Sequence, residues 1–592
     1  MHYRPTFGSF GAAMNQSCVT FMSQAAIEAS VPQKLGLQRK AVAVKNTRLI
    51  GKKYLDGPTD RRHDRACSMI VDFNHCEDGA QFEADVCIVG GGMAGLTIAR
   101  SLLGTRLRVL LIESGGLVRD PHVEALNQVA SDGPTALDLV STRPRVLGGS
   151  TSAWGGFLTP LDASDFAARA SLALHGWPFT IDALAPYYHR AHAVFGLGPE
   201  CFDERLWPLF GAVPHAFDPT RLRVKFWQLS SPRVFPLVSP KRFGTLYRAE
   251  LADADNLRVL LNASAASIRT NDARTHVTEV ELRNLGGRTA RVTAHTVVLA
   301  AGAIENARLL LLAELGGEQV GRCFMEHPHT RIGTVLPNDP RGFLETWAVR
   351  RRRGTVALQP ALCPTAQFQA AQDILNASVS VEIDRHPECP TLAFSEIGKA
   401  VLARQRPPHL ARNLGRIARD PWVFAANAYG RIAHGSGVIP RVQAVVLYCR
   451  SEQEPNPDSR LTLDRERDAL GMRRARVAWR LTERDRRTVH TMAQLLTAEF
   501  ARLGIGTVAL ASWLAENDGW PDALRGGPHH SGTTRMADDP RDGVVDRDGR
   551  LHSVDNVYVA GPSVFPTNGY ANPGLTTVAL ALRLAEHLRG IV

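Results

Sequence analysis

The sequence predicts an α/β fold, α+β overall, with a parallel sheet and a separate antiparallel region, and two observations carry this prediction. Residues 84–115 run from an apolar strand through a glycine cluster and a helix to a second apolar strand, which is the order of a β-α-β unit. Between residues 336 and 520, stretches such as 444–447 and 476–481 alternate polar and apolar residues, which is typical of antiparallel strands. At 592 residues the chain exceeds what one hydrophobic core usually covers, so we expect at least two domains.

The composition excludes several classes of protein. No apolar stretch approaches the length that a membrane-spanning helix needs. The nine cysteines are scattered without a C-x-x-C pair, so neither a metal site nor a disulfide framework is expected. Because the N-terminus lacks the charged start and apolar core of a secretory signal, we expect a cytoplasmic protein.

The net charge of +11 lies mainly in residues 1–68, which hold eleven Lys/Arg and four Asp/Glu. The rest of the chain carries a net charge of only +4. The basic run 350–353 has no interleaved aromatic residues, so it predicts a solvated loop and not a nucleic-acid site.

Residues 1–68 show no helical or strand period, and we expect them to be poorly ordered. Apolar character begins at Met69, which leads into the first strand. One hypothesis is that Met69 is the natural start and that residues 1–68 are a mis-called upstream extension. The alternative is a basic targeting segment.

A dinucleotide-binding fingerprint, G-x-G-x-x-G, follows the strand at 86–89. Gly90 allows the tight turn, Gly92 lets the backbone approach a pyrophosphate, and Gly95 lets helix and strand pack closely. The N-terminus of the following helix offers unpaired N–H groups and positive potential to the phosphates. Glu113, at the end of the second strand, is placed to accept hydrogen bonds from both ribose hydroxyls. The alternative is a glycine-rich turn in another kind of α/β protein.

A second glycine-rich loop spans residues 145–156, where two glycine pairs surround small hydroxyl residues and Trp154. Backbone in such a loop can lie close to a flat ligand, and Trp154 is either a ligand contact or a packing residue. Residues 161–240 are richer in aromatic residues and proline, with a helix expected at 181–194, and they indicate a separate region.

The β-α-β signal returns near residues 257–268. An apolar strand then ends in Ala300-Ala301-Gly302, and a helix is expected at 304–312. This strand-to-helix turn is a second place where backbone can approach the dinucleotide. Capping and first-turn charge explain Glu305 and Asn306, with a cofactor contact as the alternative.

The C-terminal part follows a long amphipathic helix at 488–503. It contains the segment HHSGTTRM at 529–536, and then a strand that ends in a tight turn at 555–563. The segment GYANPG at 569–574 leads into a last helix at 575–588, with a proline where the first helical turn tolerates it.

These segments together resemble the glucose–methanol–choline (GMC) flavoprotein oxidoreductases. The resemblance runs from about Ala84 to the end of the chain and is thin in the middle. It is most similar to the bacterial branch with pyranose oxidase and the sugar and gluconate dehydrogenases, because Asn-Pro stands where other members carry a second histidine. The matched pieces are the fingerprint, RVLGGSTSAWGG, GWPFTIDALAPYYHRA, VVLAAGAIENARLLLL, VGRCFMEHPH, EQEPNPDSRLTL, HHSGTTRM and NVYVAGPSVFPTNGYANPGLTTVALAL.

The resemblance implies a Rossmann-like FAD-binding domain interleaved with a substrate domain on an antiparallel sheet. The implied FAD-binding segments are 69–160, 241–335 and 521–592, and the implied substrate-domain segments are 161–240 and 336–520. Ala153 stands where a linking histidine would precede the loop tryptophan, so non-covalent FAD is expected. The cofactor-binding residues that fingerprint, loops and resemblance indicate are Gly90, Gly92, Met93, Ala94, Gly95, Glu113, Gly148, Gly149, Ser150, Thr151, Trp154, Gly155, Ala265, Ala301, Gly302, Asn306, Gly561, Pro562, Asn572, Pro573 and Thr576.

The implied reaction oxidises the CH–OH group of an alcohol, sugar or polyol to a carbonyl, with hydride transfer to flavin N5. By its position in the motif, His529 is the general base, with His530 as the fallback, and Asn572 stabilises the alkoxide. A histidine can accept a proton near neutral pH, and an asparagine amide can donate to a developing alkoxide without titrating. His327 and His329 resemble half a metal site, but no second half appears, so we interpret them as structural.

Other functions remain open on the same fold. The alternative is a non-redox, FAD-containing lyase similar to the hydroxynitrile lyases, and a scaffold without turnover is a third possibility. The expected partners are a small alcohol or sugar and, for a dehydrogenase, a cytochrome or quinone that accepts electrons. Nucleic acid and a transmembrane segment are not expected.

Overall fold

The computed structural model describes residues 69–133, 137–169, 176–210, 214–230, 241–348, 350–351, 357–402, 406–423, 425–426, 429, 442–515 and 519–592. The chain divides into two units, Met1–Arg65 and Ala66–Val592, and the account below concerns the second. The expectations for residues 1–68 therefore lie outside the described residues. The loop predicted for 350–353 is wrong in its described part, since Arg350–Arg351 form the short strand β12, paired with β13 (Ala357–Pro364).

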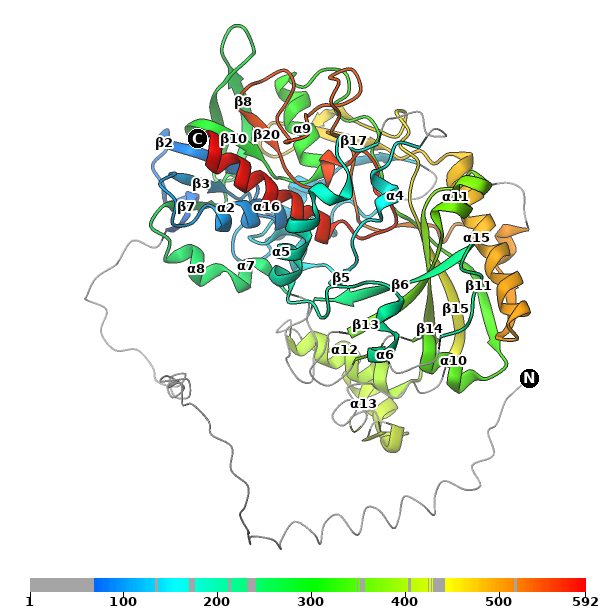
Figure 1. Ribbon diagram of the computed structural model, residues 1–592. Helices are drawn as coiled ribbons and strands as arrows, with labels where there is room; N and C mark the ends of the chain where they lie inside the picture. Colours follow the sequence, from blue (N-terminus) through cyan, green and yellow to red (C-terminus); the bar gives the residue numbers. More distant parts are fainter. Residues whose placement is uncertain are drawn as a thin grey trace, which may run out of the picture. The chain divides into compact units, whose positions relative to one another are not determined.

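An eight-stranded sheet carries the predicted parallel β-α-β unit, which confirms the fold class. Its strands β1, β7, β3, β2 and β10 lie side by side, parallel throughout, and β20 joins β10 in the same direction. Segments from the N-terminal, central and C-terminal parts of the chain therefore share one sheet (Figure 1). The strands are β1 (Ile70–Asp72), β2 (Ala80–Val89), β3 (Val109–Ile112), β7 (Leu257–Leu261), β8 (Ser264–Thr270), β9 (Val277–Arg283), β10 (Thr289–Leu299) and β20 (Val557–Val559).

The β-α-β unit expected at 257–268 is wrong. Strands β7 and β8 follow each other across Asn262 and Ala263, with no helix between them, and Asn262 adopts a left-handed φ of 57°. Strand β8 pairs antiparallel with β9, and β9 pairs antiparallel with β10. Two adjacent apolar strands leave too little chain for a crossover helix, which requires a dozen residues or more.

Both faces of this sheet are buried, which explains why its central strands are unbroken apolar runs. On one face, Val86 and Ile88 pack with the helices α2 (Met93–Ser101), α5 (Ala185–Phe195) and α16 (Gly574–Ile591). On the other face, Cys87 and Val89 pack against a cluster that includes α9 (Ala303–Ala313).

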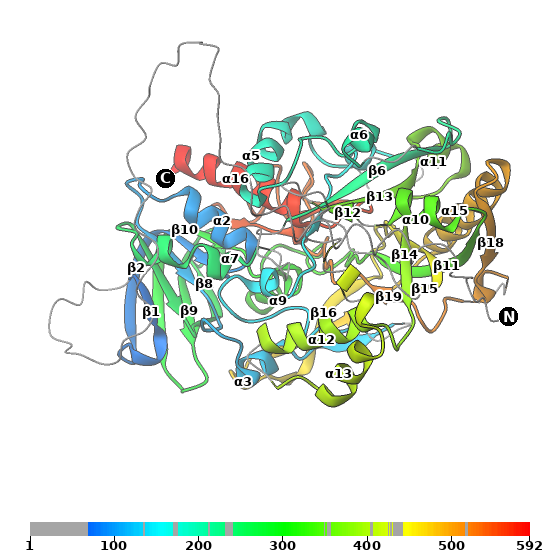
Figure 2. The ribbon, with the colours of Figure 1, turned by 90° about the horizontal axis from the view of Figure 1, so that it is seen from below.

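A nine-stranded sheet forms the second part, and every pairing in it is antiparallel, as predicted. The helix α15 (Glu483–Arg502) packs on one face, and a capping box between Thr482 and Asp485 fixes its start. The two sheets lie at opposite sides of the described unit in both views (Figures 1 and 2). Besides β12 and β13, the strands are β5 (Phe157–Leu158), β6 (Leu222–Leu229), β11 (Pro328–Pro337), β14 (Ala377–Arg385), β15 (Val442–Ser451), β18 (Gly506–Leu510) and β19 (Arg525–Gly526).

A small third sheet joins β16 (Arg460–Arg467), β17 (Arg473–Ala478) and β4 (Ala130–Asp132), and it contacts α9. The remaining helices are short: α3 (Pro121–Glu124), α4 (Ala163–Phe166), α6 (Trp207–Phe210), α7 (Phe243–Leu246), α8 (Arg248–Ala252), α10 (Pro340–Trp347), α11 (Ala366–Gln372), α12 (Pro390–Leu402) and α13 (Leu410–Ala418).

Sheet membership departs from the expected segment boundaries in several places. The short strands β5 and β19 belong to the nine-stranded sheet, although 69–160 and 521–592 are expected in the FAD-binding domain. Strand β11 belongs to the nine-stranded sheet from Pro328 onward, although residues 241–335 are expected in the FAD-binding domain. Strands β16 and β17 lie within 336–520, but they form a separate sheet in which β17 pairs with β4, from the first FAD-binding segment. The chain passes from one sheet to the next here without a linker. The amino-acid composition therefore gives no sign of where one sheet ends and the next begins. The six-segment division itself stays a prediction.

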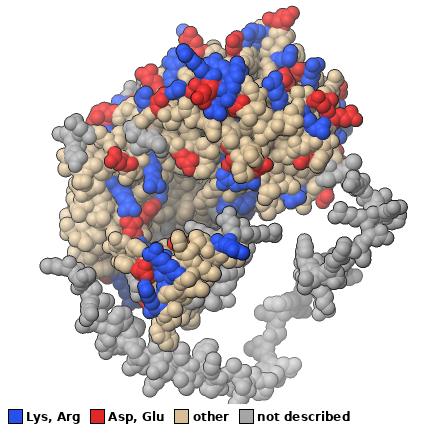
Figure 3. All heavy atoms as spheres, turned by 180° about the vertical axis from the view of Figure 1, so that it is seen from behind, with Lys and Arg blue, Asp and Glu red and all other residues tan. Residues whose placement is uncertain are grey.

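On the face shown in Figure 3, Lys and Arg side chains are interspersed with Asp and Glu. Exposed ion pairs among the described residues include Arg541 with Asp539 and Arg547 with Asp538. In the part of the chain that the structure describes, no helix is long and apolar enough to cross a membrane.

Candidate active site

The glycine turn after β2 has the backbone geometry that the fingerprint requires. Gly90 has a φ of 111°, and a Cβ there would lie 2.6 Å from the carbonyl oxygen of Ala300. A Cβ on Gly95 would lie 1.9 Å from the carbonyl oxygen of Gly90, so α2 and β2 approach as closely as predicted. Gly92 is the N-cap of α2, and a Cβ there would meet no protein atom within 4 Å. The helix N-terminus therefore presents bare backbone to open space.

Glu113 ends β3 and braces this turn. Its two carboxyl oxygens accept hydrogen bonds from the backbone N–H groups of Gly91 and Gly115, each at 2.8 Å. Burial raises the pKa of Glu113 to about 7, although these hydrogen bonds and the charge of Arg145 act in the opposite direction. The oxygen that accepts from Gly115 also accepts from the hydroxyl of Ser114 at 3.5 Å, whereas the oxygen that accepts from Gly91 keeps a second lone pair with which it can accept a ribose hydroxyl.

The loop that carries Trp154 lies directly on the glycine turn. The N–H of Gly148 donates to the carbonyl of Gly91 at 2.8 Å, and a Cβ on Gly149 would lie 2.9 Å from the Cα of Gly92. The indole N–H of Trp154 donates to the carbonyl of Lys241 at 3.0 Å. This bond holds the indole ring at the edge of the cavity described below.

Two further turns meet at the ends of β10 and β20, and Asn306 joins them. Its side chain accepts from the N–H of Ala301 at 2.8 Å and donates to the carbonyl of Ala560 at 3.1 Å and the hydroxyl of Ser563 at 3.0 Å. Because β2, β10 and β20 are parallel, their carboxyl ends lie at one edge of the sheet, where α/β proteins bind ligands.

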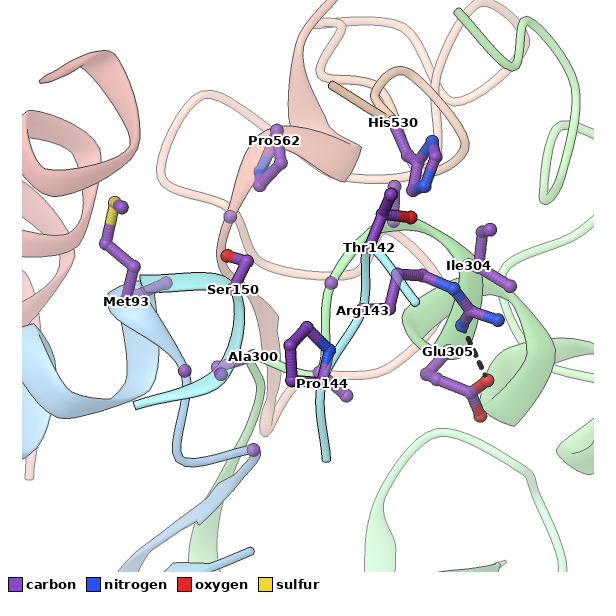
Figure 4. Close-up of a pocket in the computed structure, with 18 of the residues that line it drawn as sticks. Met93, Thr142, Arg143, Pro144, Ser150, Ala300, Ile304, Glu305, His530 and Pro562 are labelled. Atoms are coloured by element: carbon purple, nitrogen blue, oxygen red, sulfur yellow. Dashed lines mark hydrogen bonds and ion pairs between the residues drawn. The ribbon is translucent and has the colours of Figure 1, made fainter. Parts of the chain in front are cut away.

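A cavity of about 540 Å³ lies at this edge. In Figure 4, Met93, Ser150, Ala300 and Pro562 come from four segments of the chain that surround it. The residues of the sequence-based prediction that line the cavity are Gly90, Gly92, Met93, Ala94, Glu113, Gly149, Ser150, Trp154, Gly155, Ala265, Ala301, Gly302, His529, His530, Gly561, Pro562, Asn572 and Pro573. Their contact with a cofactor remains a prediction.

Five predicted cofactor residues lie behind the lining, where each makes contacts within the protein, and their contact with a cofactor also stays a prediction. Asn306 joins the two turns and Gly95 packs α2 on β2, as described above. A Cβ on Gly148 would lie 2.6 Å from the backbone nitrogen of Gly244. The buried hydroxyl of Thr151 donates to the carbonyl of Gly148, and that of Thr576 bonds the hydroxyl of Tyr188 at 2.8 Å. Sequence position alone does not separate a residue on the cavity wall from one just behind it.

Sequence reasoning considered Glu305 as a cap or a cofactor contact, but it missed the two arginines that pair with Glu305 on the cavity wall. Arg143 and Arg145 each lie 3.2 Å from the carboxyl group of Glu305, at the start of α9, and all three line the cavity (Figure 4). Burial alone would raise the pKa of Glu305, but Arg145, Arg308 and Arg143 lower it to about 2. The available signal is the Arg-Pro-Arg sequence directly before the second glycine loop, which by itself resembles an ordinary polar connector.

The two neighbouring histidines of the C-terminal motif turn in different directions. His530 makes a close contact with a carboxyl oxygen of Glu326 and stacks on Phe324, with ring centroids 5.8 Å apart. His529 instead places Nδ1 2.8 Å from Nδ1 of His327, and its backbone N–H donates to Glu326 at 2.9 Å. Of these two histidines, His530 has a carboxylate against its ring and His529 has another histidine.

Desolvation dominates the electrostatics of His529. Burial, followed by the neighbouring His327, His329 and His530 and by Arg450, holds its pKa well below the ordinary value. The ring is therefore neutral at physiological pH and able to accept a proton. His327 and His329, interpreted from the sequence as structural, both have rings within 6.0 Å of the His529 ring centroid. Among the described residues, no group of three His, Cys, Asp or Glu is placed to hold a metal ion.

Asn572 lines the same cavity at the start of α16. Its amide N–H donates to the carbonyl of Phe157 at 2.9 Å, which fixes the orientation of the side chain. The structure thus brings His529 and Asn572, which are far apart in the turn-rich C-terminal segment, to one cavity with the glycine turns. Their roles remain predictions.

The cavity suits FAD on the evidence of its own backbone. At Gly92 and Gly302 a Cβ would meet no protein atom within 4 Å, so both positions leave room for a ligand against bare backbone. Glu113 is placed for ribose hydroxyls, and the N-terminus of α2 for phosphates.

Comparisons with known proteins show which proteins this chain is similar to. Residues 455–581 match the family model described as GMC oxidoreductase. The fructose dehydrogenase large subunit of Gluconobacter japonicus is 22% identical over 85% of this chain and 97% of the relative. Paromamine 6'-oxidase of Streptomyces fradiae is 25% identical over 86% of this chain and 91% of the relative.

Two solved structures share the fold. A formate oxidase matches with a TM-score of 0.52 at 16% identity, covering 87% of this chain and 99% of the other. A fungal aryl-alcohol oxidase matches with a TM-score of 0.52 at 14% identity, covering 86% and 99%. At these identities the likeness concerns the fold.

Proposed function

The chain belongs to the GMC oxidoreductases, a family that binds FAD, and from this membership we propose that it oxidises the CH–OH group of a sugar, polyol or other alcohol to a carbonyl. One observation carries the proposal: His529 and Asn572 line the same cavity as the dinucleotide turns. A proton acceptor and a hydrogen-bond donor are the two groups that removal of hydride from a carbinol carbon requires of the protein.

His529 is the general base of this reaction. Its neutral ring takes the hydroxyl proton of the substrate, and the amide of Asn572 donates to the oxygen on which negative charge develops. The first turn of α16 adds the positive end of a helix beside Asn572. FAD, when bound, would supply the acceptor for the hydride, which carries the two electrons of the C–H bond.

FAD is bound without a covalent link through this loop. Ala153 lines the cavity directly before Trp154, and its methyl group cannot form a bond to the isoalloxazine ring. Acid precipitation of the protein would then release the whole yellow cofactor into the supernatant.

A polyhydroxylated substrate is supported by the polar residues near His529. Arg450, on β15, pairs across the strands with His329 of β11, whose ring centroid lies 6.0 Å from that of His529. It donates to the hydroxyl of Ser380 at 2.5 Å and to the carboxyl of Glu382 at 2.6 Å, both on β14. Fructose dehydrogenase and paromamine 6'-oxidase, by their names, also act on molecules of the sugar class. The name "large subunit" further supports a separate electron-accepting partner, such as a cytochrome or a quinone.

The test is an anaerobic visible spectrum of the full chain with a panel of sugars, polyols and simple alcohols. We expect the flavin absorption to bleach with one substrate class and to return when a dye or oxygen is added. His529→Ala should retain FAD without bleaching. His192→Leu, which changes a buried histidine outside the cavity, should behave as wild type.

Bound FAD that no alcohol bleaches would contradict the redox proposal, and cyanohydrin cleavage would then test the lyase alternative. Bleaching that survives His529→Ala would exclude His529 as the base and direct attention to His530. A purified protein without flavin colour would contradict the proposal that it binds FAD.

A further inference from the structure

Two antiparallel segments hold the loop that carries His529. Met325 and Ser531 exchange backbone hydrogen bonds of 3.0 Å, and the N–H of Gly527 donates to the carbonyl of His327 at 3.0 Å. Strand β19 continues the pairing along the start of β11. The ring of His529 therefore has a fixed neighbour in His327, two hundred residues earlier in the chain.

A short contact joins the two rings. Nδ1 of His327 and Nδ1 of His529 lie 2.8 Å apart, and the ring planes are inclined at 71°. His327 is 1% exposed, and its second nitrogen, Nε2, lies 3.3 Å from the carbonyl oxygen of Asn568. The amide of Asn568 in turn donates to the carbonyl of Glu326 at 3.2 Å, which fixes the position of that residue.

The position of each proton follows from this chain of contacts. A neutral imidazole carries one N–H and one lone pair. A carbonyl oxygen only accepts, so Nε2 of His327 carries the proton and its Nδ1 carries the lone pair. A separation of 2.8 Å between two nitrogens is a hydrogen bond only when a single proton lies between them, and that proton therefore belongs to Nδ1 of His529.

We infer that His327 is a positioning residue, which holds His529 in the tautomer with its proton on Nδ1 and its lone pair on Nε2. The role of that lone pair rests on the proposed function, whereas the tautomer does not. In the reaction, the O–H bond of the substrate breaks, its electron pair stays on oxygen, and the proton binds to Nε2. The electrons of the C–H bond leave with the hydride that FAD accepts.

The other neighbours of His529 do not take this role. The ring of His329 has its centroid 6.0 Å from that of His529 and packs edge-on against Tyr448. The ring of His530 faces Glu326. Glu326 accepts a hydrogen bond from the backbone N–H of His529 at 2.9 Å, so it fixes the backbone of the loop and does not pair with the His529 ring.

The direct test is ¹⁵N NMR of the full, FAD-bound protein labelled on its histidines. The signals that disappear in His529→Ala belong to His529. We expect a protonated Nδ1 and an unprotonated Nε2 in the wild type, and a mixture of tautomers in His327→Leu. A wild-type His529 protonated on Nε2, or one whose tautomer is unchanged in His327→Leu, would overturn the inference.

His327→Asn is the conservative partner, because its amide oxygen can accept at about the place of the histidine Nδ1. It should restore the Nδ1–H tautomer, and failure to do so in a folded variant would also count against the inference. The matched control is His192→Leu, a buried histidine of α5 that does not line the cavity. Its substitution should leave the signals of His529 unchanged.

Kinetics give an independent readout. In single-turnover flavin reduction, His327→Leu should slow the rate constant about 10- to 100-fold, the loss typical when the partner that orients a functional histidine is removed. Substrate affinity and FAD content should stay as in the wild type, and His327→Asn should recover most of the rate. An unchanged rate in His327→Leu would overturn the positioning role. An unchanged rate in His529→Ala, with the tautomer as expected, would instead overturn the proposed base.

Discussion

Glu113 and Gly91 are joined by a hydrogen bond of 2.8 Å, in which the carboxyl group at the end of β3 accepts from the glycine turn that follows β2. The bond ties two parallel strands together at the edge where the cavity lies. It also keeps the Glu113 side chain in a buried place, where its charged form is disfavoured.

Glu113→Gln should remove a pH dependence from the stability of the apoprotein. Burial raises the folded-state pKa to about 7. As pH rises from about 4.5, the unfolded chain releases this proton before the folded chain does. The free energy of unfolding of the wild type therefore falls by up to about 3 kcal/mol by pH 8. Urea unfolding at pH 5 and pH 8 should show that the free energy of unfolding falls less between these two pH values in Glu113→Gln than in the wild type. The exposed Glu586→Gln should match the wild type, and an equal loss in Glu113→Gln would refute this account.

Gly95→Ala should destabilise the fold and weaken FAD binding. The added methyl group would lie 1.9 Å from the carbonyl oxygen of Gly90, so α2 must move away from β2 at a cost of about 1–3 kcal/mol or more. The matched control is Gly590→Ala, also in a helix, where a Cβ meets nothing within 4 Å. Thermal unfolding and flavin content measure both effects. Normal flavin content in Gly95→Ala would show that the close approach is not needed.

Asn572→Ala should slow flavin reduction about 100-fold, because the alkoxide loses a donor worth about 3 kcal/mol in the transition state. FAD should remain bound, since the glycine turns are unchanged. Asn338→Ala is the matched control: its amide also donates to a backbone carbonyl, that of Gly504 at 2.9 Å, but it does not line the cavity. Anaerobic stopped-flow reduction measures the rate. A rate within about threefold of wild type in Asn572→Ala would exclude this role.

The rate constant of flavin reduction should not change with pH until the pH falls well below 6.5. The base works in its neutral form, and burial together with the nearby histidines and Arg450 holds the pKa of His529 well below its ordinary value. Activity should therefore fall only when the pH drops through that lowered pKa. The measurement is the rate constant of reduction at saturating substrate across the pH range in which the protein stays folded. An acidic limb at or above pH 6.5 would contradict it.

Local features of the sequence predicted the backbone geometry of the glycine turn. The glycine spacing predicted the turn from β2 to α2, because a residue with a side chain would place its Cβ against backbone there, 1.9 Å from a carbonyl oxygen at Gly95. Glu113 was predicted from its place at the end of an apolar strand, and it reaches that turn. Asn306, in contrast, has the same sequence context as a cofactor contact, but its side chain forms its hydrogen bonds with two protein turns.

The sequence by itself determined the β-α-β unit and the antiparallel region, because each depends on residue types at short spacing, and its resemblance to the GMC family indicated the candidate pair His529 and Asn572. Only the tertiary structure decided the surroundings of that pair. His327 and His529 meet through the pairing of β11 with β19, and Arg143 meets Glu305 across 162 positions. Contacts at such separation depend on how strands from distant segments align. Local periodicity carries no information about that alignment.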